Sequence, residues 1–219
     1  MKHKFEQRCD FSALAASRIT GLKEMSTRAL TQISTLSMEL EHAHIKQYPN
    51  LVASGAMLAQ LNNELIALDY LHKIEHGERA LICVEYVVRE FLATQAEFIK
   101  IIASSKNITD VAVVCDNLLL WEFDQLLLSA AVRGAALQAL QKADSKILFT
   151  AAVENDFLKL SIEDDGAANS IVQDSFGIAT YFAKTISVLH NVNNKHGYVE
   201  LRDTSSIGGT AFSIYLPNY

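Results

Sequence analysis

Apolar residues recur at helical spacing through the first third of the chain. Between residues 10 and 75 they follow one another at intervals of three to five positions, which is the pattern of long amphipathic helices. The pattern breaks at KQYPNLVASG, residues 46–55, and resumes from Met57 to Gly77. It predicts two helices of about 35 and 22 residues joined by a short turn, an αα-hairpin.

A lone hairpin cannot bury the apolar stripes of both its helices. We therefore expect it to pair with a second copy of the chain in a dimeric four-helix bundle, so that the protein is a homodimer. In the alternative arrangement, the hairpin packs only on the C-terminal part of its own chain.

Near residue 78 the pattern changes, and strand-like and helix-like runs begin to alternate. A short strand and a helix are predicted in ALICVEYVVREFLATQAEFIKIIA, a strand in DVAVVCD and a helix in FDQLLLSAAVRGAALQALQKA. Then come two strands with a turn at Glu154–Asp156, a helix in FGIATYFAKTISVLHNV and a closing hairpin in GYVELRDTSSIGGTAFSIYLP. The sequence predicts an α+β fold, with a helical hairpin over residues 1–77 and an α/β sandwich over residues 78–219.

Composition and charge narrow the range of functions. Half of the 219 residues are hydrophobic and the formal net charge is −6 with no block of basic residues, which argues against disorder and against nucleic-acid binding. The chain has no signal peptide pattern and no apolar run of the roughly 20 residues that a bilayer requires. Its three cysteines are widely spaced, which is typical of thiols in a reducing compartment and not of a metal site. We expect a cytoplasmic protein without nucleic-acid or membrane partners.

Five segments resemble, in order and spacing, those of a sensor histidine kinase core, in which a dimerising hairpin precedes an ATPase domain of the GHKL type. They are LNNELIALDYLHKIEHGERALI, WEFDQLLLSAAVRGAALQALQKA, SIEDDGAAN, FGIATYFAKTISVLH and GGTAFSIYLP. The last three are similar to the family's D-x-G-x-G turn, G-L-G-L-x-I-x-K helix and G-T-x-F-x-x-x-L-P strand. The resemblance covers about residues 10–217 and implies a GHKL-type sandwich after the hairpin.

The resemblance also implies which residues line a nucleotide pocket. Asp164 takes the position of the aspartate that accepts the adenine amino group, and Gly166 and Gly177 those of glycines near the nucleotide. Gln138 takes the position of the asparagine that binds Mg²⁺, but its extra methylene moves the amide oxygen by about 1.5 Å. The strict octahedral geometry of Mg²⁺ accommodates such a shift poorly. Ala168 replaces the final glycine of the turn and adds a Cβ.

The segment in the position of the family's ATP lid is short. Only AANSIVQDSF lies between Gly166 and Gly177, and Ser175 replaces one of the glycines whose amides hold phosphates. Little then remains to offset the desolvation of a triphosphate. We predict that the remnant pocket has lost ATP and Mg²⁺ and that the protein has no cofactor and no metal.

The family's phosphoacceptor histidine has two candidates on the first helix. His44 stands five residues before Pro49, as in the family pattern H-[E/D]-x-x-[T/x]-P, and His42 is close to it. Ile45 replaces the acidic residue that would act as a base. His42 and His44 are therefore either phosphoacceptors near the tip of the hairpin or exposed residues at a helix end.

In the family, the phosphoacceptor histidine lies at a typical distance along the chain from the end of the second helix. That distance points to a different place on the first helix. There ALTQI resembles the family's P-L-T-x-I and puts Glu24 at the histidine position, while a shifted register puts Gly21 there. Neither residue can carry a phosphoryl group on an imidazole.

Three functions are compatible with these residues. In the first, the protein is a two-component signalling protein without ATP-dependent kinase activity, a dimeric partner or regulator of a response regulator or a kinase. It would then dock around Glu24, Thr27 and Arg28. In the second, it is a histidine phosphotransferase that relays phosphoryl groups through His44, and in the third it is a soluble, active histidine kinase.

Overall fold

The structure is a computed structural model, which describes residues 19–32, 35, 49–78, 80–103, 108–167 and 177–218. The chain divides into two compact units, Met1–Ala80 and Leu81–Tyr219. The phosphoacceptor candidates His42 and His44 lie outside the described residues, as do Ala168 and Ser175.

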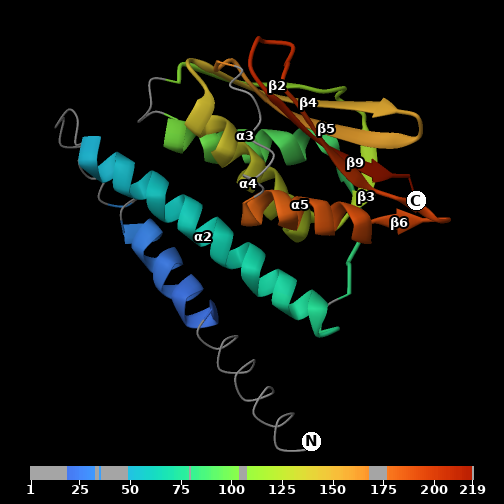
Figure 1. The fold of residues 1–219 in the computed structure, drawn as a ribbon, viewed down its shortest axis with the longest axis horizontal. Helices are drawn as coiled ribbons and strands as arrows, with labels where there is room; N and C mark the ends of the chain where they lie inside the picture. Colours follow the sequence, from blue (N-terminus) through green and yellow to red (C-terminus); the bar gives the residue numbers. More distant parts are fainter. Residues whose placement is uncertain are drawn as a thin grey trace, which may run out of the picture. The chain divides into compact units, whose positions relative to one another are not determined.

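The first unit contains a helical hairpin. Residues 19–32 are helical, and polar contacts join them to α2 (Pro49–Glu75), along which they run antiparallel (Figure 1). Proline suits the first position of α2 because its fixed φ is helical and its missing N–H would have no partner there. The helix ends before Gly77, whose φ of 67° is the left-handed conformation common after helices.

The second unit is a sandwich of helices and strands. Its helices are α3 (Val88–Ala103), α4 (Gln125–Lys142) and α5 (Ile178–Leu189). Its strands are β1 (Val84–Val87), β2 (Asp110–Val114), β3 (Leu120–Phe123), β4 (Lys146–Glu154), β5 (Phe157–Asp164), β6 (Asn191–Val192), β7 (Lys195–His196), β8 (Tyr198–Arg202) and β9 (Ala211–Pro217).

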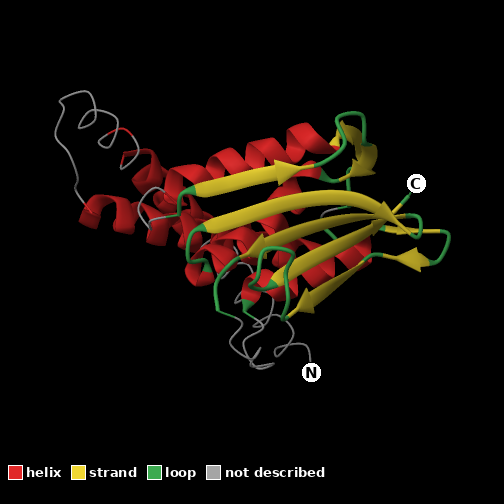
Figure 2. Ribbon diagram, turned by 90° about the horizontal axis from the view of Figure 1, so that it is seen from above, coloured by secondary structure: helices red, strands yellow, loops and turns green. Residues whose placement is uncertain are grey.

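Five of these strands form one mixed sheet in the order β2-β4-β5-β9-β8. β2 is parallel to β4, and the other neighbours are antiparallel. The helices of this unit lie on one face of the sheet (Figure 2). The core between the two layers is apolar; its fully buried side chains include Leu92, Leu128, Phe149, Leu160, Ile162, Phe182 and Ile214.

The predicted α+β fold is confirmed, with differences in detail. The short strands β6 and β7 were not predicted, and β6 lies where the helix FGIATYFAKTISVLHNV was expected to continue. α2 begins at Pro49, although the break in the pattern predicted a start near Met57. The short strand β3 was not predicted; it pairs with β1 and alternates exposed and buried residues. Its four residues directly precede a strongly apolar helix, and an alternation of only four residues cannot be told apart from the helical pattern that follows.

Among the described residues, no helix combines the length and the apolar character that crossing a membrane requires.

Candidate functional site

Asp164 ends β5, at the position that the resemblance assigns to adenine recognition. Its side chain is buried, with 1% of the residue exposed. Oδ1 accepts hydrogen bonds from the N–H of Gly166 at 3.1 Å and of Thr210 at 3.2 Å, and Oδ2 accepts one from the Thr210 hydroxyl. Because a carboxylate has about four acceptor positions, most of them are used within the chain.

The neighbouring carboxylates are also bonded within the chain. Asp165 accepts hydrogen bonds from the backbone N–H groups of Asp144, Ser145 and Lys146 at 3.0 Å and from the Ser145 hydroxyl at 2.6 Å. Partial burial opposes ionisation, but these bonds outweigh it and lower the pKa of Asp165 to about 2. Glu163 accepts from the backbone N–H and the hydroxyl of Ser206. The three acidic residues of SIEDDG thus anchor the segments around them.

Gly166 is required by packing at the end of α4. A Cβ at this position would lie 2.0 Å from the carbonyl oxygen of Lys142, a distance that no side chain can occupy. Gly209 is equally close to Asp164, since its Cβ would lie 2.4 Å from the Asp164 carbonyl oxygen. Close contacts within the protein therefore explain why glycine is needed at both positions, and a bound nucleotide is not required for the explanation.

Gln138, which takes the position of the family's Mg²⁺-binding asparagine, lies on α4 and faces the start of α5. Its Oε1 accepts a hydrogen bond from the Thr180 hydroxyl at 3.4 Å, and a Cβ at Gly177 would lie 3.7 Å from its Nε2. The structure therefore brings Gln138 and Gly177 together, and Asp164 and Gly166 together. Gln138 uses the oxygen that would ligate a cation in its contact with Thr180. Across the described ranges, no group of three or more His, Cys, Asp or Glu residues is placed to hold a metal ion.

His190 follows α5 and is fully buried. Its Nε2 accepts a hydrogen bond from the Asp124 N–H at 3.1 Å, and its Nδ1 lies 2.8 Å from the carbonyl oxygen of Ile186, to which it donates in this tautomer. Burial lowers the pKa of His190, because the charged form would be desolvated. Asp124 in turn caps α4 by accepting from the N–H of Leu127. His190 is thus a structural residue that fixes the start of α4.

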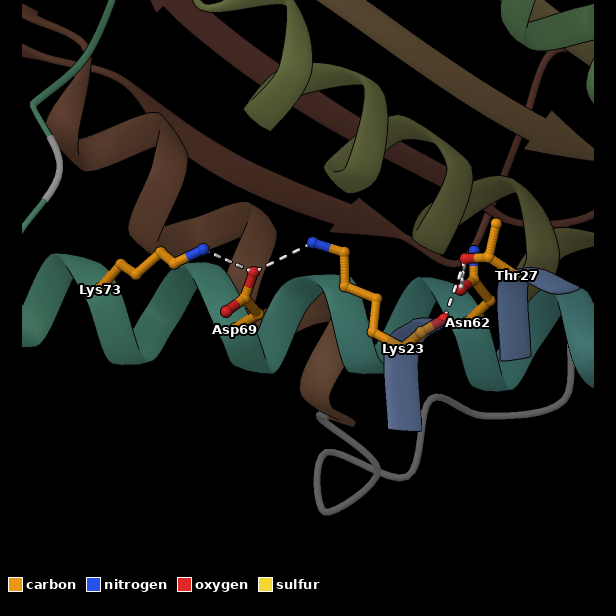
Figure 3. A network of polar contacts seen from close by, with 5 residues as sticks. All are labelled: Lys23, Thr27, Asn62, Asp69 and Lys73. Carbon is orange, nitrogen blue, oxygen red and sulfur yellow. Dashed lines mark hydrogen bonds and ion pairs between the residues drawn. The ribbon is translucent and has the colours of Figure 1, made fainter. Parts of the chain in front are cut away.

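The predicted docking residues lie on the first helix of the hairpin. Glu24 and Arg28 are exposed and form an ion pair of 3.9 Å one turn apart. The Thr27 hydroxyl lies 2.9 Å from the carbonyl oxygen of Lys23 and 3.1 Å from Oδ1 of Asn62 on α2, and these two acceptors share its one hydrogen (Figure 3). Glu24 and Arg28 are accessible to a partner, while Thr27 joins the two helices.

A second polar contact between the helices centres on Asp69. Lys23 and Lys73 approach the same oxygen, Oδ2, at 3.1 Å and 2.9 Å (Figure 3). Burial opposes ionisation of Asp69, but the hydrogen bonds and charges of the two lysines outweigh it, so its pKa is lower than usual. The polar contacts at Asn62 and Asp69 help to fix how the helices align.

Among the described residues of the hairpin, four large apolar side chains are exposed: Leu22, Met25, Met57 and Leu61, at 52%, 68%, 75% and 48%. We call them the apolar strip. Each immediately precedes a residue that is bonded to the other helix, namely Lys23, Ser26, Leu58 and Asn62.

This offset places the apolar strip on one side of the hairpin. One residue is a rotation of about 100° around a helix axis. Because the two helices are antiparallel, the same rotation on each turns the side chains to the same side of the pair. The four side chains of the strip therefore lie on the same side of the hairpin.

Thr210 and Thr180 are the site residues that sequence reasoning missed. Thr210 is part of the GGTAF motif and so carried a signal, but its bond to Asp164 depends on the return of the chain across 46 residues. Thr180 lies in the segment FGIATYFAKTISVLH, but the family's helix motif assigns it no role, and its contact with Gln138 joins residues 42 positions apart.

No protein-family model matches the chain, and no curated protein does. Solved structures do share its fold. The histidine kinase AdeS of Acinetobacter baumannii has a TM-score of 0.60 at 14% identity, over 88% of this chain and 96% of that one. The cytoplasmic segment of the histidine kinase QseC has a TM-score of 0.52 at 15% identity, over 74% and 95%.

Full-length ShkA, solved in complex with AMPPNP, has a TM-score of 0.59 at 18% identity, over 97% of this chain and 46% of ShkA. Identities this low establish a fold and leave activity open. The predicted resemblance is confirmed at that level: the chain has the fold of a histidine kinase core, with a helical hairpin and a GHKL-type domain.

Proposed function

We propose that the protein is a dimeric two-component signalling protein that binds a response-regulator receiver domain or a histidine kinase and regulates it without ATP. The observation that carries this proposal is the use of the pocket's own polar groups within the chain. Asp164 bonds to Thr210 and Gln138 to Thr180, each on a distant segment of the chain. Such bonds stabilise the fold and leave few groups to recognise Mg²⁺ and a triphosphate.

The apolar strip supports the dimer. Exposed Met and Leu side chains contribute about 1.5–3 kcal/mol each when they are buried. A second hairpin packed on the strip would cover four such side chains from each copy in a four-helix bundle. The histidine kinase fold of the chain agrees with this arrangement.

The partner surface is proposed at the exposed pair Glu24 and Arg28. These residues lie one turn apart, and their long separation of 3.9 Å leaves the pair open to competition from a partner's charges. We place the protein in the cytoplasm, where receiver domains and the catalytic parts of histidine kinases act.

The test is the binding of purified receiver domains, encoded by the same genome, to the full-length protein. Replacing Arg28 with Glu reverses a charge at the proposed surface, and we expect the affinity to fall by about tenfold, or about 1.4 kcal/mol. The measurement is titration calorimetry, with Lys195→Glu in the second unit as the matched charge reversal.

Equal affinities of wild type and Arg28→Glu would contradict the proposed surface. Repeating the incubation with phosphorylated receivers separates the second function from the first. Acid-labile phosphate on the wild type, lost in His44→Ala, would assign a phosphotransferase instead of a non-covalent regulator.

A further inference from the structure

Arg133 is a cation of the second unit that lies between two helices. It belongs to α4 and is half-buried. Its Nε donates a hydrogen bond to Oε1 of Gln95 on α3 at 2.8 Å, and its guanidinium lies 4.5 Å from the centre of the Phe98 ring. One hydrogen bond and one aromatic face therefore fix the plane of the guanidinium.

Within the described part of the chain, no carboxylate pairs with Arg133. Burial lowers its pKa, and no neighbouring charge acts in the opposite direction. Other arginines do have anionic partners, since Arg28 pairs with Glu24 and Arg202 with Glu200. A half-buried charge without a counter-ion destabilises a folded protein, so its presence calls for a compensating role.

The two helices that hold Arg133 also carry exposed apolar side chains. Its Nη groups, which carry four of the five N–H donors, have no hydrogen bond among the described residues. Ile101, one turn after Phe98 on α3, is 70% exposed, and Leu126, two turns before Arg133 on α4, is 60% exposed. Oriented arginines and exposed apolar side chains are enriched among the residues that dominate protein–protein binding energies.

We infer that Arg133 is a docking anchor for an acidic side chain of a protein partner, with Phe98, Ile101 and Leu126 contacting the partner's apolar residues. The Nη donors form a planar fork that matches the two oxygens of a carboxylate. The partner's Asp or Glu supplies the counter-ion that the chain itself lacks. This inference rests on the proposed function, because the partner is the receiver domain or histidine kinase that the protein regulates.

The test compares Arg133→Gln, Arg133→Lys and Arg133→Met with wild type in the full-length protein. The probes are purified receiver domains and histidine kinases of the same genome. We expect Arg133→Gln to weaken binding about tenfold or more, and Arg133→Lys to restore little because an ammonium group has no planar fork. The melting temperature of Arg133→Gln or Arg133→Met should stay the same or rise, since an uncompensated charge is removed. Arg202→Gln, which removes a paired and exposed arginine, is the control and should bind normally.

Two results would overturn the inference. In the first, Arg133→Gln and Arg133→Met bind as tightly as wild type while Arg28→Glu does not, which leaves the proposed function intact. In the second, both Arg133 variants melt several degrees lower, which assigns Arg133 a structural role between α3 and α4. If no probe binds the wild type, the proposed function and this inference both fail.

Discussion

We expect that replacing Met25 and Leu61 together with aspartate converts the proposed dimer to a monomer. Both side chains belong to the apolar strip, and they are 68% and 48% exposed in the single chain. In a four-helix bundle the two aspartates would be buried as unpaired charges, which costs several kcal/mol for each. Light scattering after gel filtration measures the effect: wild type should have twice the mass of the 24.2 kDa chain, and the double variant that of one chain.

Thr31→Asp is the matched control for this prediction. Thr31 is exposed on the same helix, and its hydroxyl bonds only to the carbonyl oxygen of Thr27 one turn earlier. Thr31→Asp adds one of the same negative charges away from the strip, so the variant should remain a dimer. A wild-type mass of one chain at micromolar concentration would show that the strip serves another purpose.

Gly166→Ala should strongly destabilise the second unit in the absence of any nucleotide. The new Cβ would lie 2.0 Å from the carbonyl oxygen of Lys142, so the end of α4 or the turn after β5 must move. Overpacking of this kind costs about 3 kcal/mol. In a unit of this size, that lowers the melting temperature on the order of 10 °C. Thermal unfolding followed by circular dichroism is the measurement.

Gly177→Ala is the control for the glycine prediction. Both glycines belong to motifs that resemble a nucleotide pocket, but a Cβ at Gly177 would lie an ordinary 3.7 Å from Nε2 of Gln138. Gly177 has a φ of −63° and precedes α5, so alanine there should cost less than about 1 kcal/mol. Equal stabilities of the two variants would mean that Gly166 is not retained for packing.

The sequence predicted those parts of the fold whose signals are local. The turn between β4 and β5 is an example, because Asn155 and Asp156 tolerate their positive φ values of 51° and 64°. The apolar periodicity likewise predicted α3 and α5, each of which has one buried face.

The partners of the candidate site residues were beyond prediction, because they depend on how distant segments meet. Asp164 is bonded to Thr210 and Asp165 to Ser145, at separations of 46 and 20 residues. A sequence motif suggests that such a carboxylate binds a ligand, although the same carboxylate can instead form hydrogen bonds within the protein and stabilise the fold. Arg133 has no motif at all, and α4 is buried over so much of its surface that its pattern does not indicate which face is accessible.

The central claim, regulation without ATP, is tested most directly by calorimetric titration of the full-length protein with ATP and Mg²⁺ at millimolar concentrations. We predict no saturable heat of binding, because Gln138 and the carboxylates of SIEDDG are already bonded within the chain. Saturable binding of one ATP per chain would contradict the account. If ATP bound and were present at a hundred times its Kd, it would also raise the free energy of unfolding by about 2.7 kcal/mol.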